Sequence, residues 1–192
     1  MKAWLENFWY YHKWHFMFTI FALFLLILAI SQFVGKEHFD YNVVLYTSLE
    51  VQNDTCETMA REFERFGEDI NGDGEVKVQI INCGYNPANA EMRMAQTGKF
   101  QANLAAPETV LIITDSANFS LLDSQGAFEA FQGFPDKNGE AIDLAQTVFN
   151  AKIKSDMPAE YFLSKRVYNE NAKEYTENSA VLLRKMLSEY TK

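Results

Sequence analysis

The chain of 192 residues is poor in the residues that many hydrolytic enzymes use for covalent and acid–base chemistry. It has two cysteines and three histidines, and His12 and His15 fall beside a long apolar stretch near the N-terminus. The third, His38, follows that stretch closely, so a Ser-His-Asp or Cys-His site has no suitable histidine in the rest of the chain. The sequence also lacks a phosphate-binding glycine loop, an internal repeat and a low-complexity tract.

Positive charge is scarce as well. Seventeen Lys and Arg residues stand against 26 Asp and Glu residues, and the net charge is −9. The first 35 residues carry Lys2, Lys13 and Glu6, so the negative excess belongs to the remainder of the chain. An acidic surface repels phosphate backbones and anionic headgroups, which argues against nucleic-acid binding. The roughly 150 residues after Val43 suffice for one hydrophobic core.

The single long apolar run extends from Phe16 to Val34 and contains no charged residue. As a helix it would be roughly 28 Å long, close to the hydrocarbon thickness of a bilayer. A signal peptide has a shorter apolar core and a small-residue cleavage site, and residues 29–34 offer only a poor site. The sequence predicts a retained transmembrane helix at 16–34, after an aromatic juxtamembrane segment at 1–15.

The residues that flank this span predict its surroundings and orientation. All three tryptophans precede it, at Trp4, Trp9 and Trp14. Such amphipathic rings favour the headgroup layer, and the alternative is that they pack against a partner helix. Lys2 and Lys13 precede the span and Lys36 follows it, so the charge bias favours a cytoplasmic N-terminus at the cell membrane. A tether at 35–42 would then lead to a domain at 43–192 outside the cytoplasm.

Strands and helices alternate in the predicted domain. Apolar runs at 43–46, 76–81 and 109–114 predict three buried strands. The helices between and after them begin at Asn53 or Asp54 with Glu57 completing a capping box, at Asn86-Pro87, and at Asp115-Ser116. The second helix ends near Gly98, and a further short helix follows at 99–106. This order predicts an α/β fold with three layers and a mostly parallel sheet.

The last third of the sequence is less regular. Residues 134–139 have turn chemistry, and the mixed run at 161–168 suits an antiparallel strand at the sheet edge. A final helix begins near Asn171 and packs on the sheet. Its apolar face comprises Tyr175, Leu182, Leu183, Met186 and Tyr190.

The first half of the domain resembles the opening of an extracellular solute-binding protein. The resemblance rests on VVLYTS, a helix carrying AREFERFG, VKVQII and TVLIITD, and covers about residues 43–115. It implies a ligand site after the carboxyl ends of the strands. The implied positions are Thr47, Ser48, Gly84, Tyr85, Asp115 and Ser116. Solute-binding proteins close two lobes around a ligand, whereas this chain has room for one, and ordinary loop functions are the alternative.

An acidic loop at 69–75 matches the first half of an EF-hand calcium loop. The ligands would be the side chains of Asp69, Asn71 and Asp73 and the backbone carbonyl of Glu75. Gly74 stands at the sixth position, but the twelfth, where a bidentate glutamate belongs, is Ile80. Either another part of the fold completes a structural Ca²⁺ site, or the loop is a polar turn.

The two cysteines, Cys56 and Cys83, lie in the first turn of the first predicted helix and at the end of the second predicted strand. Both points fall on the same edge of a parallel sheet, so a disulfide is geometrically feasible. Two separate buried thiols are the alternative.

These features favour a membrane-anchored, extracytoplasmic single lobe that binds rather than transforms its target. It would be an accessory or scaffold subunit beside another membrane protein, or a domain for a small-molecule ligand. One alternative is a membrane-tethered hydrolase with an acidic site on Asp115. Another is a structural partner that contacts a membrane protein through the aromatic segment.

Overall fold

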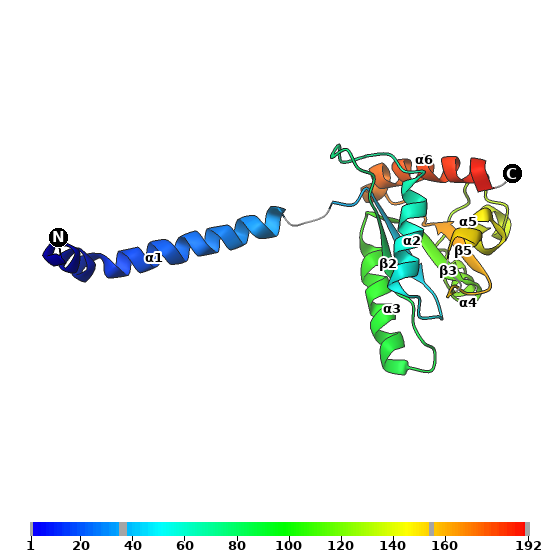
Figure 1. Ribbon diagram of the computed structural model, residues 1–192. Coiled ribbons are helices and arrows are strands. Elements are labelled where there is room, and N and C mark those ends of the chain that lie inside the picture. The colour runs from blue at the N-terminus through cyan, green and yellow to red at the C-terminus, as the bar shows by residue number, and fades with distance from the viewer. Residues whose placement is uncertain (1, 35–37, 154–155, 191–192) are drawn as a thin grey trace. The chain divides into compact units, whose positions relative to one another are not determined.

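The computed structural model describes residues 2–34, 38–153 and 156–190, in two compact units, Met1–His38 and Phe39–Lys192. In the first unit, helix α1 (Lys2–Val34) runs through both the aromatic segment and the apolar run (Figure 1). Its stretch His12–Ala29 is long and apolar enough to cross a membrane, and none of it is buried. By length and composition, this helix fits a membrane anchor or a signal sequence.

The second unit contains one mixed sheet of five strands in the order β2-β1-β3-β5-β4. The strands are β1 (Tyr41–Tyr46), β2 (Val78–Asn82), β3 (Thr109–Asp115), β4 (Ala141–Asp143) and β5 (Tyr161–Lys165). Strand β1 pairs in parallel with β2 and β3, whereas β3 with β5 and β5 with β4 are antiparallel pairs. The α/β class is confirmed, but the parallel arrangement is limited to β2, β1 and β3.

The strand predicted at the sheet edge lies inside the sheet. Strand β5 is antiparallel to its neighbour, as predicted, but β4 pairs with its other side. All five residues of β5 are buried, as expected of an inner strand. Strand β4 has only three residues and shows no periodic pattern, so the sequence did not reveal it.

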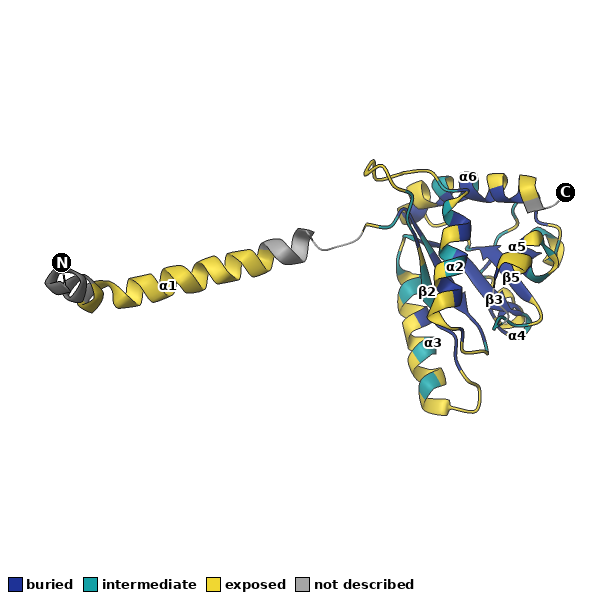
Figure 2. Cartoon of the chain, viewed as in Figure 1, coloured by how far each residue is buried: buried dark blue, intermediate teal, exposed yellow. Residues whose placement is uncertain are grey.

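Helices cover both faces of the sheet (Figure 1). Helices α2 (Asn53–Glu64), α5 (Val148–Lys152) and α6 (Lys173–Tyr190) contribute to one apolar cluster, and α3 (Ala90–Ala105) and α4 (Ser116–Asp123) to the other. Short 3₁₀ turns occur at η1 (Lys137–Gly139), η2 (Leu144–Gln146) and η3 (Glu170–Ala172). Strands β1 and β3 are therefore buried from both sides, which explains their continuous apolar sequences (Figure 2).

The domain begins earlier than predicted. Tyr41 is buried, and the backbone N–H of Asp40 donates to Lys77 O at 2.9 Å. These residues belong to the sheet rather than to a tether ending at residue 42. The buried aromatic ring of Tyr41 gives the free-energy reason, because it joins the cluster under α2 and α6.

Two helix boundaries also differ. The N-cap of α2 is Gln52, which makes no side-chain capping bond, so the predicted capping box is wrong. Instead Asp156, from a distant loop, accepts hydrogen bonds from Gln52 N at 2.7 Å and from Thr55 Oγ1. The predicted break at Gly98 is also wrong, because α3 continues through it from a cap at Asn89. Phe100 is the buried residue of α3 and fixes its later turns against the sheet.

The final helix keeps most of its predicted apolar face. Leu182, Leu183 and Met186 are fully buried. Tyr175 is 40% exposed, so its predicted place in the core is wrong, and the side chain of Tyr190 lies outside the described residues. Asn169 caps the preceding η3 turn, two residues before the predicted start.

Candidate functional site

The polar residues predicted at the carboxyl ends of β1, β2 and β3 lie together. Asp115 Oδ2 accepts from Ser48 N at 2.5 Å, and Asp115 Oδ1 accepts from Asn118 N at 2.8 Å. The Ser48 hydroxyl lies 3.2 Å from both Tyr85 Oη and Asn118 Nδ2. Tyr85 Oη in turn donates to Asn118 Oδ1 at 3.2 Å. We call these four residues the carboxyl-edge network.

Local structure explains this convergence. Asp115 ends β3 and is the N-cap of α4, so Asn118 stands at the third position of the helix and its N–H points back to the cap. Sequence reasoning missed Asn118, although its spacing from Asp115 is the capping spacing. Ser48 and Tyr85 follow the neighbouring parallel strands. The network therefore joins three strand ends to one helix start.

Two of the other predicted ligand positions, Thr47 and Gly84, have structural functions. Thr47 Oγ1 donates to Leu49 O at 2.9 Å, and Thr47 O accepts from Tyr85 N at 3.0 Å. A Cβ on Gly84 would lie 2.4 Å from Leu49 O, so only glycine fits there. Within the described part of the chain, the hydroxyl of Ser116 has no hydrogen-bond partner.

The polar groups of the carboxyl-edge network are buried or half-buried and already hydrogen-bonded. Asp115, Asn118 and Tyr85 are buried, and the hydrogen bonds above engage their polar groups. Burial raises the pKa of the adjacent Tyr46, which stacks on Phe100 with ring centroids 4.2 Å apart and stays a neutral phenol. The arrangement braces the sheet edge.

The acidic loop is closed by its own backbone. Asp69 accepts from Gly72 N and Gly74 N, Asn71 from Asp73 N, and Asp73 from Glu75 N, at 2.7–2.9 Å. The positive φ angles of Gly72 and Gly74 permit this path. Asp40, beside β1, anchors the loop by accepting from Ile70 N at 2.9 Å and from Lys77 N at 2.8 Å.

A lysine already supplies a cation to the loop. Lys77 Nζ lies 3.2 Å from Asp73 Oδ2 and 2.9 Å from Glu75 Oε2. The Glu75 backbone N–H and, after it, the Lys77 ammonium lower the pKa of Asp73. Among the described residues, no three His, Cys, Asp or Glu side chains are grouped to hold a metal ion. Calcium binding at Asp69, Asn71, Asp73 and Glu75 stays a prediction, and Lys77 would compete with it.

The cysteines occupy opposite sides of the sheet. Cys56 belongs to the cluster with α2 and α6, and Cys83 to the cluster with α3 and α4. Both are free and buried, so the structure has the arrangement of two separate thiols and not the expected disulfide. Burial, with a smaller contribution from Asp156, raises the pKa of Cys56 to about 11, and burial also raises that of Cys83.

A pair of carboxyl groups lies away from the carboxyl-edge network. A hydrogen bond with Asp123, in which the protonated Glu140 carboxyl donates, is the main reason that the pKa of Glu140 is raised. Asp123 is the last residue of α4, so the pair stands at the far end of that helix from Asp115. It does not join Asp115 in an acidic site.

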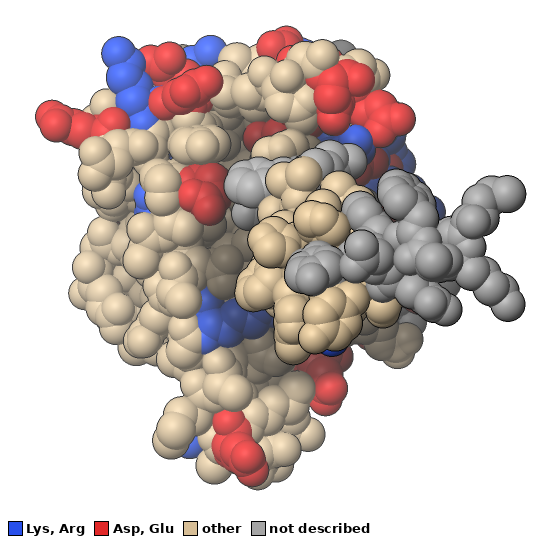
Figure 3. All heavy atoms as spheres, turned by 90° about the vertical axis from the view of Figure 1, so that its left-hand side faces the viewer, with Lys and Arg blue, Asp and Glu red and all other residues tan. Residues whose placement is uncertain are grey.

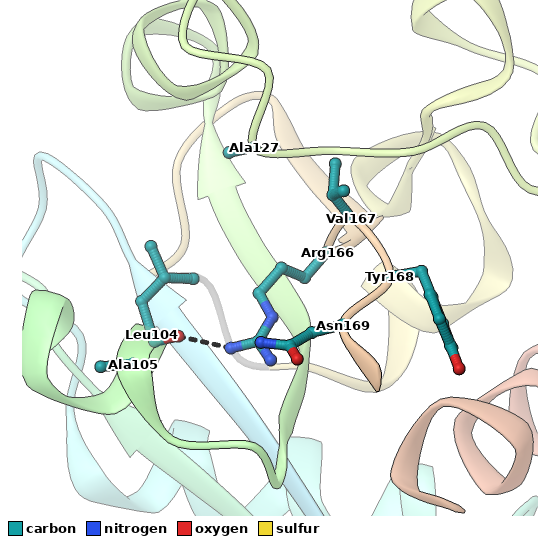
Figure 4. Close-up of a pocket in the computed structure, with 7 residues that line it drawn as sticks. All are labelled: Leu104, Ala105, Ala127, Arg166, Val167, Tyr168 and Asn169. Carbon is teal, nitrogen blue, oxygen red and sulfur yellow. Dashed lines mark hydrogen bonds between the residues drawn. The ribbon is translucent and has the colours of Figure 1, made fainter. Parts of the chain in front are cut away.

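A cavity of about 480 Å³ lies at the opposite end of β3 from the carboxyl-edge network. It is lined by Leu104, Ala105, Ala127, Arg166, Val167, Tyr168 and Asn169 (Figure 4). Arg166 follows β5, and its backbone N–H donates to Val110 O at 2.9 Å. No motif in the sequence marked this place, because its lining comes from three distant segments.

The guanidinium of Arg166, which lines this cavity, is held by backbone carbonyls. Its Nη1 donates to Leu104 O and, at 3.0 Å, to Ala106 O, the carbonyls that end α3. Burial lowers the pKa of Arg166, and the charge of Glu108 opposes this. Elsewhere acidic side chains dominate the upper part of the face drawn in Figure 3, in keeping with the net charge of −9. The cavity is lined by a cationic side chain in a chain whose net charge is negative.

Comparison with known proteins assigns no family. No family profile, curated protein or solved structure matches the chain. The fold and the site define the protein as an α/β domain with a mixed sheet, a hydrogen-bonded carboxyl edge and a separate cavity lined by an arginine.

Proposed function

We propose that this protein is a membrane-anchored, extracytoplasmic binding domain, and that it acts as a non-catalytic accessory or scaffold subunit. The observation that carries the proposal is the carboxyl-edge network. There both carboxylate oxygens of Asp115 accept hydrogen bonds from backbone N–H groups, and the Ser48 hydroxyl lies within hydrogen-bond distance of Tyr85 and Asn118. Groups held in this way stabilise a surface and are poorly placed for proton transfer or nucleophilic attack.

The first unit supports retention at a membrane. The described side chains of the apolar part of α1 are exposed, including Phe18, Leu23 and Ile27, each more than half exposed. Exposed apolar area of this kind is stable in lipid and not in water. Lys2 and Lys13 before the span, against Lys36 after it, favour a cytoplasmic N-terminus, which supports the proposal that the domain lies outside.

Two features support binding as the task of the domain. The resemblance to one lobe of a solute-binding protein accounts for the order of β1, α2, β2, α3 and β3. The cavity at Arg166 offers a volume within the range of small-molecule sites. A target can therefore be a small molecule or a membrane protein beside the anchor.

The competing hypothesis of a hydrolase needs a carboxylate partner for Asp115. In the described chain, the Asp123–Glu140 pair is the one whose shared hydrogen bond raises a carboxyl pKa, and it lies at the other end of α4. The hypothesis of a purely structural partner uses the aromatic residues of α1, such as Trp9 and Trp14, which are exposed. That hypothesis predicts contacts through the helix alone.

Affinity purification of the full-length chain in mild detergent tests the proposal. Two matched variants distinguish binding through the domain from binding through α1. The first replaces residues 2–34 by an unrelated transmembrane helix. The second keeps residues 1–38 and replaces the domain by an unrelated domain. We expect a stoichiometric component that follows residues 39–192 in the first variant and is lost in the second. A component that follows α1 alone would establish the structural-partner hypothesis, and turnover of a substrate that Asp115→Asn abolishes would establish the hydrolase.

A further inference from the structure

We infer that the cavity at Arg166 binds a carboxylate that carries an apolar group. The inference deepens the proposed function, since it assigns a ligand class to the binding domain. The first step concerns the hydrogen-bonding capacity of Arg166. Its Nη1 is occupied by two carbonyl oxygens, whereas Nε and Nη2 have no partner in the described part of the chain. These two nitrogens form the side of the guanidinium that matches the two oxygens of a carboxylate.

The second step concerns charge. Arg166 forms no ion pair among the described residues, although acidic residues exceed basic ones by 26 to 17 in this chain. The nearby carboxylate of Glu129 is already engaged, by Lys165 Nζ and by Tyr168 N at 2.8 Å. The charge of Glu108 acts on Arg166, but no ion pair joins the two among the described residues, so the guanidinium faces the cavity without a directly bonded carboxylate. A partly buried cation of this kind favours an anion from outside.

The third step concerns Asn169. Its Oδ1 accepts from Asn171 N at 3.0 Å, so the amide nitrogen is the end left for a ligand. Asn169 and Arg166 both line the cavity, and Figure 4 draws their polar ends in the same part of the view. Both side chains offer donors there, which suits an oxyanion.

The fourth step concerns the class of anion. One guanidinium balances one negative charge, and the lining contains no second Lys or Arg for a phosphate dianion. Leu104, Ala127 and Val167 supply an apolar wall beside the donors. The cavity therefore suits a monocarboxylate with an apolar side group. The end of a peptide and a free carboxylic acid share this chemistry.

The test uses the full-length chain in nonionic detergent and matched pairs of probes. N-acetyl-leucine is compared with N-acetyl-leucinamide, in which an uncharged amide replaces the carboxylate, and acetyl-Ala-Ala-Leu is compared with its amide. Binding is measured by ligand-observed NMR and by the shift in melting temperature. We expect each acid to bind at least about tenfold more tightly than its amide. Tighter binding of the peptide acid identifies a chain terminus as the source, and tighter binding of N-acetyl-leucine identifies a free acid.

Variants tie the binding to this cavity. Asn169→Asp keeps the capping oxygen but places a negative charge at the site, so acid binding should fall by about tenfold or more. Asn171→Asp makes the same change two residues away, outside the lining, and should bind almost as the unmodified chain does. Arg166→Lys keeps the charge but loses the fork and should weaken binding, whereas Arg93→Lys at an exposed position of α3 should not.

Three results would overturn the inference: equal binding of acid and amide, no binding of any acid, or unchanged binding by folded Asn169→Asp. Retained melting behaviour in the absence of ligand shows that each variant is folded. Failure here leaves the co-purification result intact, so the two proposals can fail separately.

Discussion

At the scale of single residues, three aspartates of this domain hold the backbone. Asp40 holds the acidic loop, Asp156 holds the start of α2, and Asp115 joins β1 to α4. Each carboxylate accepts backbone N–H groups that would otherwise lose hydrogen bonds on burial or at a helix start. Loss of such a carboxylate should therefore change stability rather than chemistry.

Asp115→Ala should lower the free energy of unfolding by roughly 2–4 kcal/mol, because it removes a helix cap and a second charge-assisted bond to Ser48 N. Ser116→Ala, at the next position, should change it by less than about 0.5 kcal/mol. Urea unfolding followed by circular dichroism measures both. A stability of Asp115→Ala equal to that of Ser116→Ala would show that the network does not brace the edge.

The two cysteines should react only after unfolding. Burial raises the pKa of Cys56 to about 11, so at pH 8 little thiolate exists and the reagent has no access. A thiol titration should find none in the native chain and two after denaturation without reductant. If no thiol titrates after denaturation of protein from its native membrane, the cysteines form a disulfide there.

The raised pKa of Cys56 also sets a direction for alkaline stability. A thiol with an ordinary pKa near 8.5 in the unfolded chain ionises there before it does in the folded one. The stability that the neutral Cys56 thiol contributes to the folded state is complete below about pH 8.5 and is lost as pH rises towards about 11. Cys56→Ala should reduce this part of the alkaline loss.

At the scale of elements, the acidic loop lies between α2 and β2 and pairs with the ammonium group of Lys77, which follows it in the chain. Lys77 bonds to Asp73 and Glu75, and the loop amides bond to Asp69 and Asn71. Lys77 and the predicted calcium ion would share one acceptor, the Asp73 carboxylate. The two cations therefore compete for Asp73.

If the loop binds calcium, the melting temperature should rise with calcium concentration. The free energy of unfolding should increase by about 2.7 kcal/mol when free calcium is a hundredfold above Kd. Asp73→Ala should abolish the rise, and Lys77→Met should enlarge it by removing the competing charge. Glu75→Gln should keep the rise, because the predicted ligand at this position is the backbone carbonyl, although the change also removes one partner of Lys77. An unchanged melting temperature of the unmodified chain in several millimolar calcium would show that the loop is only a turn.

At the scale of the whole molecule, the chain consists of an apolar helix and a domain with its own core. The domain buries two apolar clusters, one on each face of the sheet, from its own residues. The helix buries none of its apolar stretch. The membrane is the environment that would remove that surface from water.

The domain should be outside the cytoplasm, and the burial of both native thiols provides a clean background for testing this. Met94 is 78% exposed on α3, so Met94→Cys adds one accessible thiol. A membrane-impermeant maleimide should label this variant on cells stripped of any outer barrier, while the unmodified chain stays unlabelled. Labelling of Met94→Cys only after lysis of the inner membrane would place the domain in the cytoplasm.

Much of the fold could be predicted from local patterns. The apolar run of α1 and the strand–helix alternation up to α4 depend on residue spacing within a few turns, which the sequence displays directly. The meeting of Ser48, Tyr85 and Asp115 was also predictable, since parallel strands place their carboxyl ends at one edge. These features require only periodicity and the geometry of parallel strands.

Tertiary structure alone decided the remainder, because it depends on contacts between segments far apart in the chain. Strand β4 is stable only by pairing with β5, which changes an expected edge strand into an inner one and adds a second antiparallel pair to the sheet. Side-chain direction along β2 places Cys83 on the face opposite Cys56. Arg166 reaches the last carbonyls of α3 across about sixty positions of sequence, and that non-local hydrogen bonding creates the cationic cavity.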